Sequence, residues 1–159
     1  MDIADRPTKV RRGEALEIKA VEAFLKDNIK GLEGSLSISQ FPSGFSNLTY
    51  MIRVGEKELV LRRPPFGTKA KTAHDMSREY RILSALHPVF PYAPKPFVYS
   101  EDLSIMGAPF YVMERIQGII LRKDLPKGME MSPEDARRLC ENLIDLHFEL
   151  HSIDYKEVG

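Results

Sequence analysis

Residues 41–65 read FPSGFSNLTYMIRVGEKELVLRRPP, and this stretch decides the fold. It predicts two strands, over residues 48–54 and 59–63, with a hairpin turn over residues 55–58 between them. The prolines that follow the second strand cannot continue a central strand, because they lack the amide hydrogen that a sheet requires. The stretch therefore predicts an antiparallel hairpin that the chain enters through a loop of small residues.

Outward from this hairpin, the spacing of apolar residues predicts the other elements. In chain order they are a helix over 14–29, a strand over 36–40, the two hairpin strands, a helix over 75–86, strands over 97–100 and 109–115, and a long helix capped by Ser132. This order predicts an α+β fold with a five-stranded, mostly antiparallel sheet and one helix inserted after the third strand.

The length of 159 residues suits one compact domain better than two. Residues 1–13 are predicted to be a loose, charged leader. Lys and Arg total 23, and Asp and Glu also total 23, which argues against a general nucleic-acid binder. A single cysteine, no apolar run of membrane length and no signal-peptide core disfavour secretion and a membrane span, so we expect a cytoplasmic protein.

The loop that precedes the hairpin has the composition of a phosphate-binding turn. Gly44 lets the main chain approach a ligand closely, while Ser43, Ser46 and Asn47 supply donors around Phe45. Successive main-chain N–H groups in such a loop can hold phosphate oxygens. No Gly-Lys-Ser/Thr follows, so this is not a Walker loop, and an ordinary hairpin connection is the alternative.

The second hairpin strand carries a cation that needs a partner. Strand alternation places Val60 and Arg62 on one face, and a buried cation is costly unless it is paired. Glu79 is the only charge in the apolar stripe of the following helix, which is otherwise made of Met76, Leu83 and Leu86. We therefore expect an ion pair between Arg62 and Glu79 that leaves guanidinium donors for a phosphate. The alternative is that Glu79 lies in solvent at the edge of the stripe.

Residues 110–118 form an apolar strand that runs into an extended segment and ends at glycine. Such a segment can offer unpaired main-chain groups to a flat heterocycle, and Met113 can line the pocket behind it. An edge strand followed by a turn is the alternative interpretation.

In this order, the motifs resemble the nucleotide-binding lobe of the protein-kinase-like fold. More closely, they resemble the aminoglycoside phosphotransferase and choline kinase-like family, in the branch sometimes joined to acyl-CoA dehydrogenases. The stretches that carry the resemblance are GFSNLTY (44–50), LVLRRPP (59–65), SREYRIL (77–83), YVMER (111–115) and QG (117–118). It implies an N-lobe over residues 14–117, with an N-terminal helix, and over 118–159 a linker and the first helix of an incomplete C-lobe.

The resemblance also implies the cofactors, ATP and Mg²⁺, and a role for each matching position. The loop from Ser43 to Asn47 would cover the phosphates, Arg62 would replace the usual strand lysine, and Glu79 would orient that cation. Met113 would lie behind adenine, and the Glu114 carbonyl and the Ile116 N–H would bind its edge. The magnesium ligands are expected in the missing lobe.

The implied reaction moves the γ-phosphoryl group of ATP to a hydroxyl of a small acceptor: an aminoglycoside, a choline-like molecule or, from the branch, a hydroxylated acyl thioester. The His-Gly-Asp-x-x-x-x-Asn segment of the family is absent, so no catalytic residue is assigned and the chain alone is expected to be inactive. His147 and His151 have a spacing that could bind zinc, but we expect ordinary helix histidines, because no glutamate directly follows His147.

Two other functions stay open. The chain could be a non-catalytic module that binds a nucleotide or a partner, with a dimer through residues 136–150, where Leu139, Leu143, Leu146 and Leu150 form an apolar stripe. It could also be a sheet-and-helix domain without a ligand. Solution size and titration with ATP and magnesium separate these readings.

Overall fold

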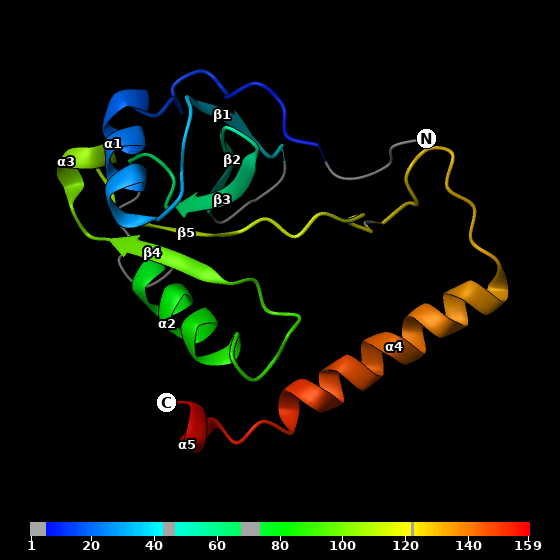
Figure 1. Cartoon of the computed structure of the whole chain (residues 1–159). Helices are drawn as coiled ribbons and strands as arrows, with labels where there is room; N and C mark the ends of the chain where they lie inside the picture. Colours follow the sequence, from blue (N-terminus) through cyan, green and yellow to red (C-terminus); the bar gives the residue numbers. More distant parts are fainter. Residues whose placement is uncertain (1–5, 43–46, 68–73, 122) are drawn as a thin grey trace.

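The computed structural model of the chain describes residues 6–42, 47–67, 74–121 and 123–159. Its elements are α1 (Ile18–Asn28), β1 (Leu36–Gln40), β2 (Leu48–Val54), β3 (Lys57–Arg63), α2 (Met76–Leu86), β4 (Pro96–Ser100), α3 (Leu103–Met106), β5 (Phe110–Glu114), α4 (Pro133–His151) and α5 (Tyr155–Val158) (Figure 1). The strands form one sheet in the order β1-β2-β3-β5-β4, and all four neighbouring pairs are antiparallel. The predicted sheet, with a helix inserted after its third strand, is confirmed.

One face of the sheet and α1 build the hydrophobic core. Val21 and Leu25 of α1 are buried against alternate residues of the strands, among them Tyr50, Ile52, Leu61, Phe110 and Val112. The Phe24 ring packs edge-on against the Phe110 ring, with the centroids 5.2 Å apart. α3 lies beside α1 (Figure 1), so both helices belong to this face of the sheet.

Among the described residues, α2 packs on one part of the opposite face. Side chains of β3 and β5 that alternate with the core residues point to this face, and α2 packs on the β4–β5 side of it. There the Tyr80 ring stacks on the Tyr99 ring, with the centroids 5.7 Å apart. The part of this face formed by β2 and β3 contains the candidate site.

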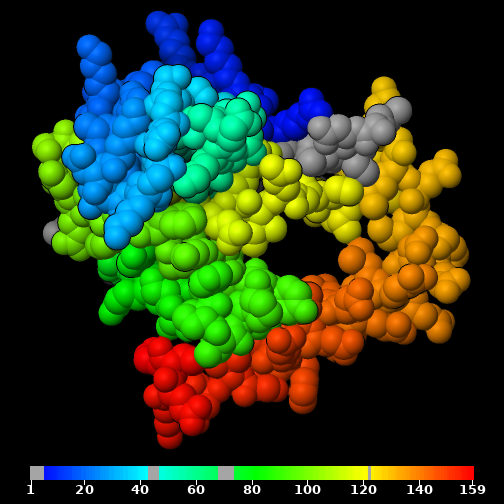
Figure 2. Space-filling model, viewed as in Figure 1, coloured from blue at the N-terminus to red at the C-terminus, as the bar shows by residue number. Residues whose placement is uncertain are grey.

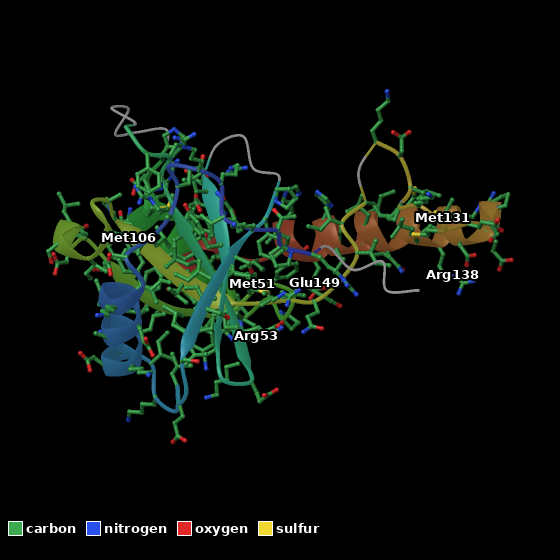
Figure 3. The ribbon with its side chains drawn as sticks, turned by 90° about the horizontal axis from the view of Figure 1, so that it is seen from above. Met51, Arg53, Met106, Met131, Arg138 and Glu149 are labelled. Carbon is green, nitrogen blue, oxygen red and sulfur yellow. The ribbon has the colours of Figure 1, made fainter. Side chains whose placement is uncertain are left out.

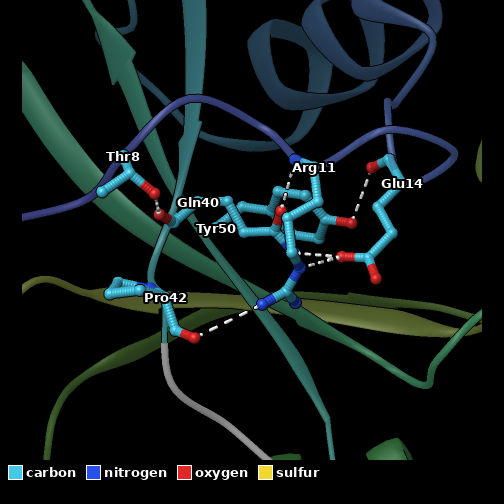
Figure 4. Close-up of polar contacts among 6 residues, drawn as sticks. All are labelled: Thr8, Arg11, Glu14, Gln40, Pro42 and Tyr50. Carbon is cyan, nitrogen blue, oxygen red and sulfur yellow. Dashed lines mark hydrogen bonds and ion pairs between the residues drawn. The ribbon is translucent and has the colours of Figure 1, made fainter.

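The first helix begins later than predicted, at Ile18 rather than at residue 14. Glu14 is engaged in contacts that a helix would break: its carbonyl accepts from the Tyr50 hydroxyl at 2.8 Å, and its carboxylate from the Gln40 amide at 2.5 Å (Figure 4). The hairpin turn is also shorter than predicted, because β3 begins at Lys57 and only Gly55 and Glu56 form the turn.

The loose leader predicted for residues 1–13 needs correction over its second part, residues 6–13. Thr8 forms an antiparallel bridge with Gln40 at the end of β1, with N–H to carbonyl distances of 2.7 and 2.9 Å (Figure 4). The Arg11 N–H donates to the Gln40 side chain at 3.0 Å, and the Arg11 guanidinium donates to the Pro42 carbonyl at 3.4 Å. Residues 6–13 therefore lie along the edge of the sheet, next to the end of β1, and Gln40 holds them there.

Two short helices, α3 and α5, were not predicted. α3 begins after Asp102, whose carboxylate accepts from the Ser104 N–H at 2.8 Å, and ends at Gly107, which has a φ of 73°. Each of these helices has four residues, too few for a periodic apolar pattern.

α4 begins as predicted, with the Asp135 N–H donating to the Ser132 hydroxyl at 3.1 Å. Its N-terminal end, near Met131 and Arg138, lies far from the sheet (Figure 3). Figure 2 shows an opening between this helix, in orange, and the yellow segment after β5. None of the α4 residues is buried. Over the described residues, no helix has both the length and the apolar character needed to cross a membrane.

Candidate functional site

A pocket of about 470 Å³ opens on the sheet face that α2 leaves uncovered. Val60 and Met113 are direct cross-strand partners, and both line it. The rest of the lining comes from Phe41, Thr49, Pro94 and the continuous segment 114–120. The pocket therefore lies between the hairpin and the extended segment that was predicted to offer its main chain to a heterocycle.

Arg62 lies directly beyond this pocket on the same face. It follows Val60 by two residues along β3, a step of about 7 Å in a strand, and it pairs with Tyr111 of β5. Arg62 Nη1 lies 3.0 Å from Oε2 of Glu79 on α2, so the predicted strand-to-helix ion pair is confirmed.

Tyr111, which the sequence analysis missed, joins the two charges of this pair. Its hydroxyl donates to Glu79 Oε2 at 2.9 Å and accepts from Arg62 Nη1 at 3.3 Å. Burial is the main cause that raises the pKa of Tyr111 above its ordinary value, so the hydroxyl keeps the proton that it donates. The alternation of β5, with Met113 assigned to the ligand face, could have identified it, because Tyr111 lies two residues earlier.

Arg62 makes both of its contacts through Nη1. Among the described residues, Nε and Nη2 have no hydrogen-bond partner, and Nε is buried. Nε and Nη2 share one edge of the planar guanidinium, the edge that binds carboxylates and phosphates through two parallel bonds. About 30% of the Arg62 side chain is exposed, so the structure leaves a cationic group with unused donors beside the pocket.

Asn47 lies at the entrance to β2 and is only 4% exposed. Its amide nitrogen donates to Glu79 Oε1 at 2.7 Å, and its amide oxygen lies 2.8 Å from Nδ1 of His74. The other predicted loop residues, Ser43, Gly44, Phe45 and Ser46, lie outside the described residues.

The segment after β5 is held from one side by a carboxylate. The side chains of Arg115 and Gln117 both donate to Oε2 of Glu58, the latter at 3.2 Å, and Arg53 pairs with Oε1. We call these four residues the Glu58 clamp. No hydrogen bond between described residues uses the main chain of residues 115–121, so the main-chain groups of Ile116 are unpaired there. Met113 and Glu114 line the pocket, as expected from their place in the sequence.

Glu58 was also missed by the sequence analysis, which assigned it to the turn. Arg115 and Gln117 alternate along an extended segment, so both side chains can reach one acceptor on the neighbouring strand. This alternation could have indicated that Arg115 and Gln117 share one partner. It could not have identified Glu58 as that partner, because this depends on the strand order, which brings β3 beside β5.

A metal site is not formed by this part of the molecule. Within residues 6–42, 47–67, 74–121 and 123–159, no three His, Cys, Asp or Glu side chains converge in a way that could hold a metal ion. His147 Nδ1 lies 2.8 Å from the Leu143 carbonyl, one helical turn earlier, as expected of an ordinary helix histidine.

A family model described as the phosphotransferase enzyme family matches residues 37–159, which is more than half of the chain. The chain belongs to the phosphotransferase enzyme family. A crystal structure described as that of an aminoglycoside phosphotransferase from Ralstonia eutropha JMP134 matches with a TM-score of 0.73 and 28% identity, over 91% of this chain and 41% of that one. The predicted protein-kinase-like phosphotransferase fold is confirmed by this match.

Curated relatives of this family member include acyl-CoA dehydrogenase family member 11 of Rattus norvegicus, 32% identical over 163 residues, and member 10 of Mus musculus, 37% identical over 147 residues. The alignments cover 100% and 91% of this chain, but 21% and 14% of those proteins. The chain thus spans about a fifth or less of the curated relatives it matches. Their names confirm the resemblance to the branch that is joined to acyl-CoA dehydrogenases.

Proposed function

We propose that this chain is the ATP-binding part of a phosphotransferase that moves the γ-phosphoryl group of ATP to a hydroxyl of a small acceptor. The observation that carries the proposal is the Nε/Nη2 edge of Arg62, which has no partner among the described residues and lies one strand step from an apolar pocket. ATP joins a flat apolar base to an anionic phosphate chain, so its site needs an apolar pocket and a cationic group next to each other.

The adenine ring is assigned to the pocket that Val60 and Met113 line. A volume of about 470 Å³ is in the range of small-molecule sites. The Glu114 carbonyl and the Ile116 N–H are the groups that would bind the edge of the base. The main chain of residues 115–121 supports this assignment, because its donors and acceptors have no partner among the described residues and are free to bind a ligand.

The phosphates are assigned to Arg62, held by Glu79 and Tyr111, together with the main-chain N–H groups of the loop from Ser43 to Asn47. ATP supplies the phosphoryl group, and the side chains described here bind and orient it. Magnesium ions are expected with ATP. The described residues do not form a site that fits the metal by themselves, so its ligands are assigned elsewhere.

The acceptor is proposed from the relatives. Their names support a hydroxylated acyl thioester, next to the aminoglycoside that the name of the matched crystal structure suggests. We further propose a cytoplasmic setting, from the composition, and no turnover by these 159 residues alone, because they contain no His-Gly-Asp-x-x-x-x-Asn segment. Phosphorylated product from Mg-ATP and a panel of such acceptors would contradict the last point.

Titration calorimetry of the 159-residue chain with Mg-ATP, and separately with adenosine, tests the proposal. Arg62→Ala removes the phosphate contact, so we expect ATP to bind at least about tenfold more weakly and adenosine to bind equally well. Arg81→Ala, at an exposed position of α2, is the matched control and should change neither affinity. A wild-type chain that binds neither ligand would refute the function.

A protein-interaction module is the second candidate, and the surface of α4 favours it. Leu139, Leu143 and Phe148 are 43%, 55% and 76% exposed, so an apolar surface is available to a partner or to a second copy. Sedimentation of the chain tests this candidate. A dimer that Leu143→Glu dissociates would support it, and a monomer at all concentrations would contradict the predicted dimer through residues 136–150.

A further inference from the structure

We infer that Asn47 is a positioning residue, which fixes the Glu79 carboxylate and thereby the guanidinium of Arg62. The inference rests on the proposed function, and it assigns Asn47 a role different from the phosphate donor that the sequence suggests. It follows from the directions of the hydrogen bonds around Glu79, from the burial of Asn47 and from the order of residues along β2 and β3.

The direction of each bond in this network can be determined. A carboxylate can only accept, so the Asn47 group that contacts Glu79 Oε1 at 2.7 Å is the amide N–H₂. The Asn47 oxygen then faces Nδ1 of His74 at 2.8 Å, and since that oxygen can only accept, Nδ1 carries a proton. Asn47 is therefore held at both ends of its amide.

The two oxygens of Glu79 are held from different sides. Oε2 accepts from Tyr111 and from Arg62, and Oε1 accepts from Asn47. Without Asn47, Oε1 would lose its partner among the described residues, and the carboxylate could turn away from the position that aligns Arg62. The Nε/Nη2 edge of Arg62 would then have no fixed direction toward a ligand.

Asn47 reaches this position because it directly precedes β2. Leu48 pairs with Arg63, and Thr49 pairs with Arg62, so the start of β2 lies beside the end of β3. From there the Asn47 amide reaches α2, where it contacts the oxygen of Glu79 that neither Arg62 nor Tyr111 contacts. A side chain that is only 4% exposed and bonded at both ends has little capacity left for a phosphate.

Calorimetry with Mg-ATP and with adenosine tests the inference on the 159-residue chain. Asn47→Asp keeps the shape of the side chain but sets an acceptor of like charge against Glu79. We expect about tenfold weaker ATP binding, the effect of one lost hydrogen bond to a charged group, and unchanged adenosine binding. Asn47→Ala, which adds no charge, carries the same expectation if the first variant does not fold.

A double variant provides the rescue. Asn47→Asp combined with Glu79→Gln reverses donor and acceptor, because an amide at 79 can donate to a carboxylate at 47. We expect the double variant to bind ATP several-fold more tightly than Asn47→Asp alone. Its net charge equals that of the wild-type chain. Asn142→Asp, the same change at an exposed position of α4, is the matched control and should bind both ligands as the wild-type chain does.

The outcomes separate the inference from the function it rests on. If the wild-type chain binds ATP and Asn47→Asp binds it equally well, or loses ATP and adenosine to the same extent, the positioning role is wrong and the proposed function stands. A double variant no tighter than the single one would also overturn it. A wild-type chain that binds neither ligand would remove the proposed function, and the inference with it.

Discussion

At the scale of single residues, the backbone conformation and surroundings of Gly55 require a glycine. Its φ is 57°, and a Cβ there would lie 2.6 Å from the carbonyl oxygen of Glu33. That oxygen belongs to the backbone, so relief of the clash requires the chain itself to move. We expect Gly55→Ala to lower the free energy of unfolding by about 2–3 kcal/mol, measured by urea denaturation.

Gly107→Ala is the matched control for this prediction. Gly107 also has a positive φ, 73°, but a Cβ there would meet nothing within 4 Å. It should therefore incur the conformational cost alone, about 1–2 kcal/mol. Equal losses in the two variants would mean that the approach of Glu33 to the turn does not restrict this position.

At the scale of elements, the Glu58 clamp connects the hairpin to the segment after β5. The hydrogen bond from Arg53 is the largest cause that lowers the pKa of Glu58, and Arg115 adds to it. A carboxyl whose pKa is lower in the folded chain stabilises the fold above its ordinary pKa, and this stabilisation is lost as the pH falls. The clamp is therefore predicted to weaken in acid.

Glu58→Gln tests this pH dependence. We expect the variant to unfold with a free energy about 1–3 kcal/mol lower than that of the wild-type chain at neutral pH, measured by urea denaturation. The difference should shrink below about pH 4, where the wild-type carboxyl becomes protonated. Glu56→Gln, at the exposed neighbouring position, should show little difference at any pH. A constant difference for Glu58→Gln would contradict the prediction.

The elements that depend on local pattern were predictable from the sequence, while contacts between distant residues were not. Strand alternation predicted Val60 and Arg62 on one face, and a lone carboxylate in an apolar stripe predicted the partner of Arg62. The identity of Asn47 marked it as a donor, but its acceptor on α2 depends on how the helix docks. In the same way, the Thr8–Gln40 bridge joins segments that no local periodicity connects.

At the scale of the whole molecule, the core and the last part of the chain are separate. The buried apolar cluster is built from residues between Leu16 and Val112. α4 contributes no buried residue, and Figures 1 and 3 show it extending away from the sheet. The N-terminal segment differs, because Gln40 is 1% exposed and bonds to Thr8, Arg11 and Glu14 (Figure 4).

This contrast predicts opposite results for two truncations. A chain that ends at residue 118 should keep its free energy of unfolding within about 1 kcal/mol, because none of the described residues after 118 is buried. A chain that lacks residues 1–13 should lose about 2–4 kcal/mol, since Gln40 would lose its hydrogen bonds to Thr8 and Arg11. Urea denaturation of both chains measures the two values. A large loss of free energy from the first truncation would mean that α4 packs on the sheet domain. No loss from the second would mean that residues 6–13 are a loose leader after all, as the sequence predicted.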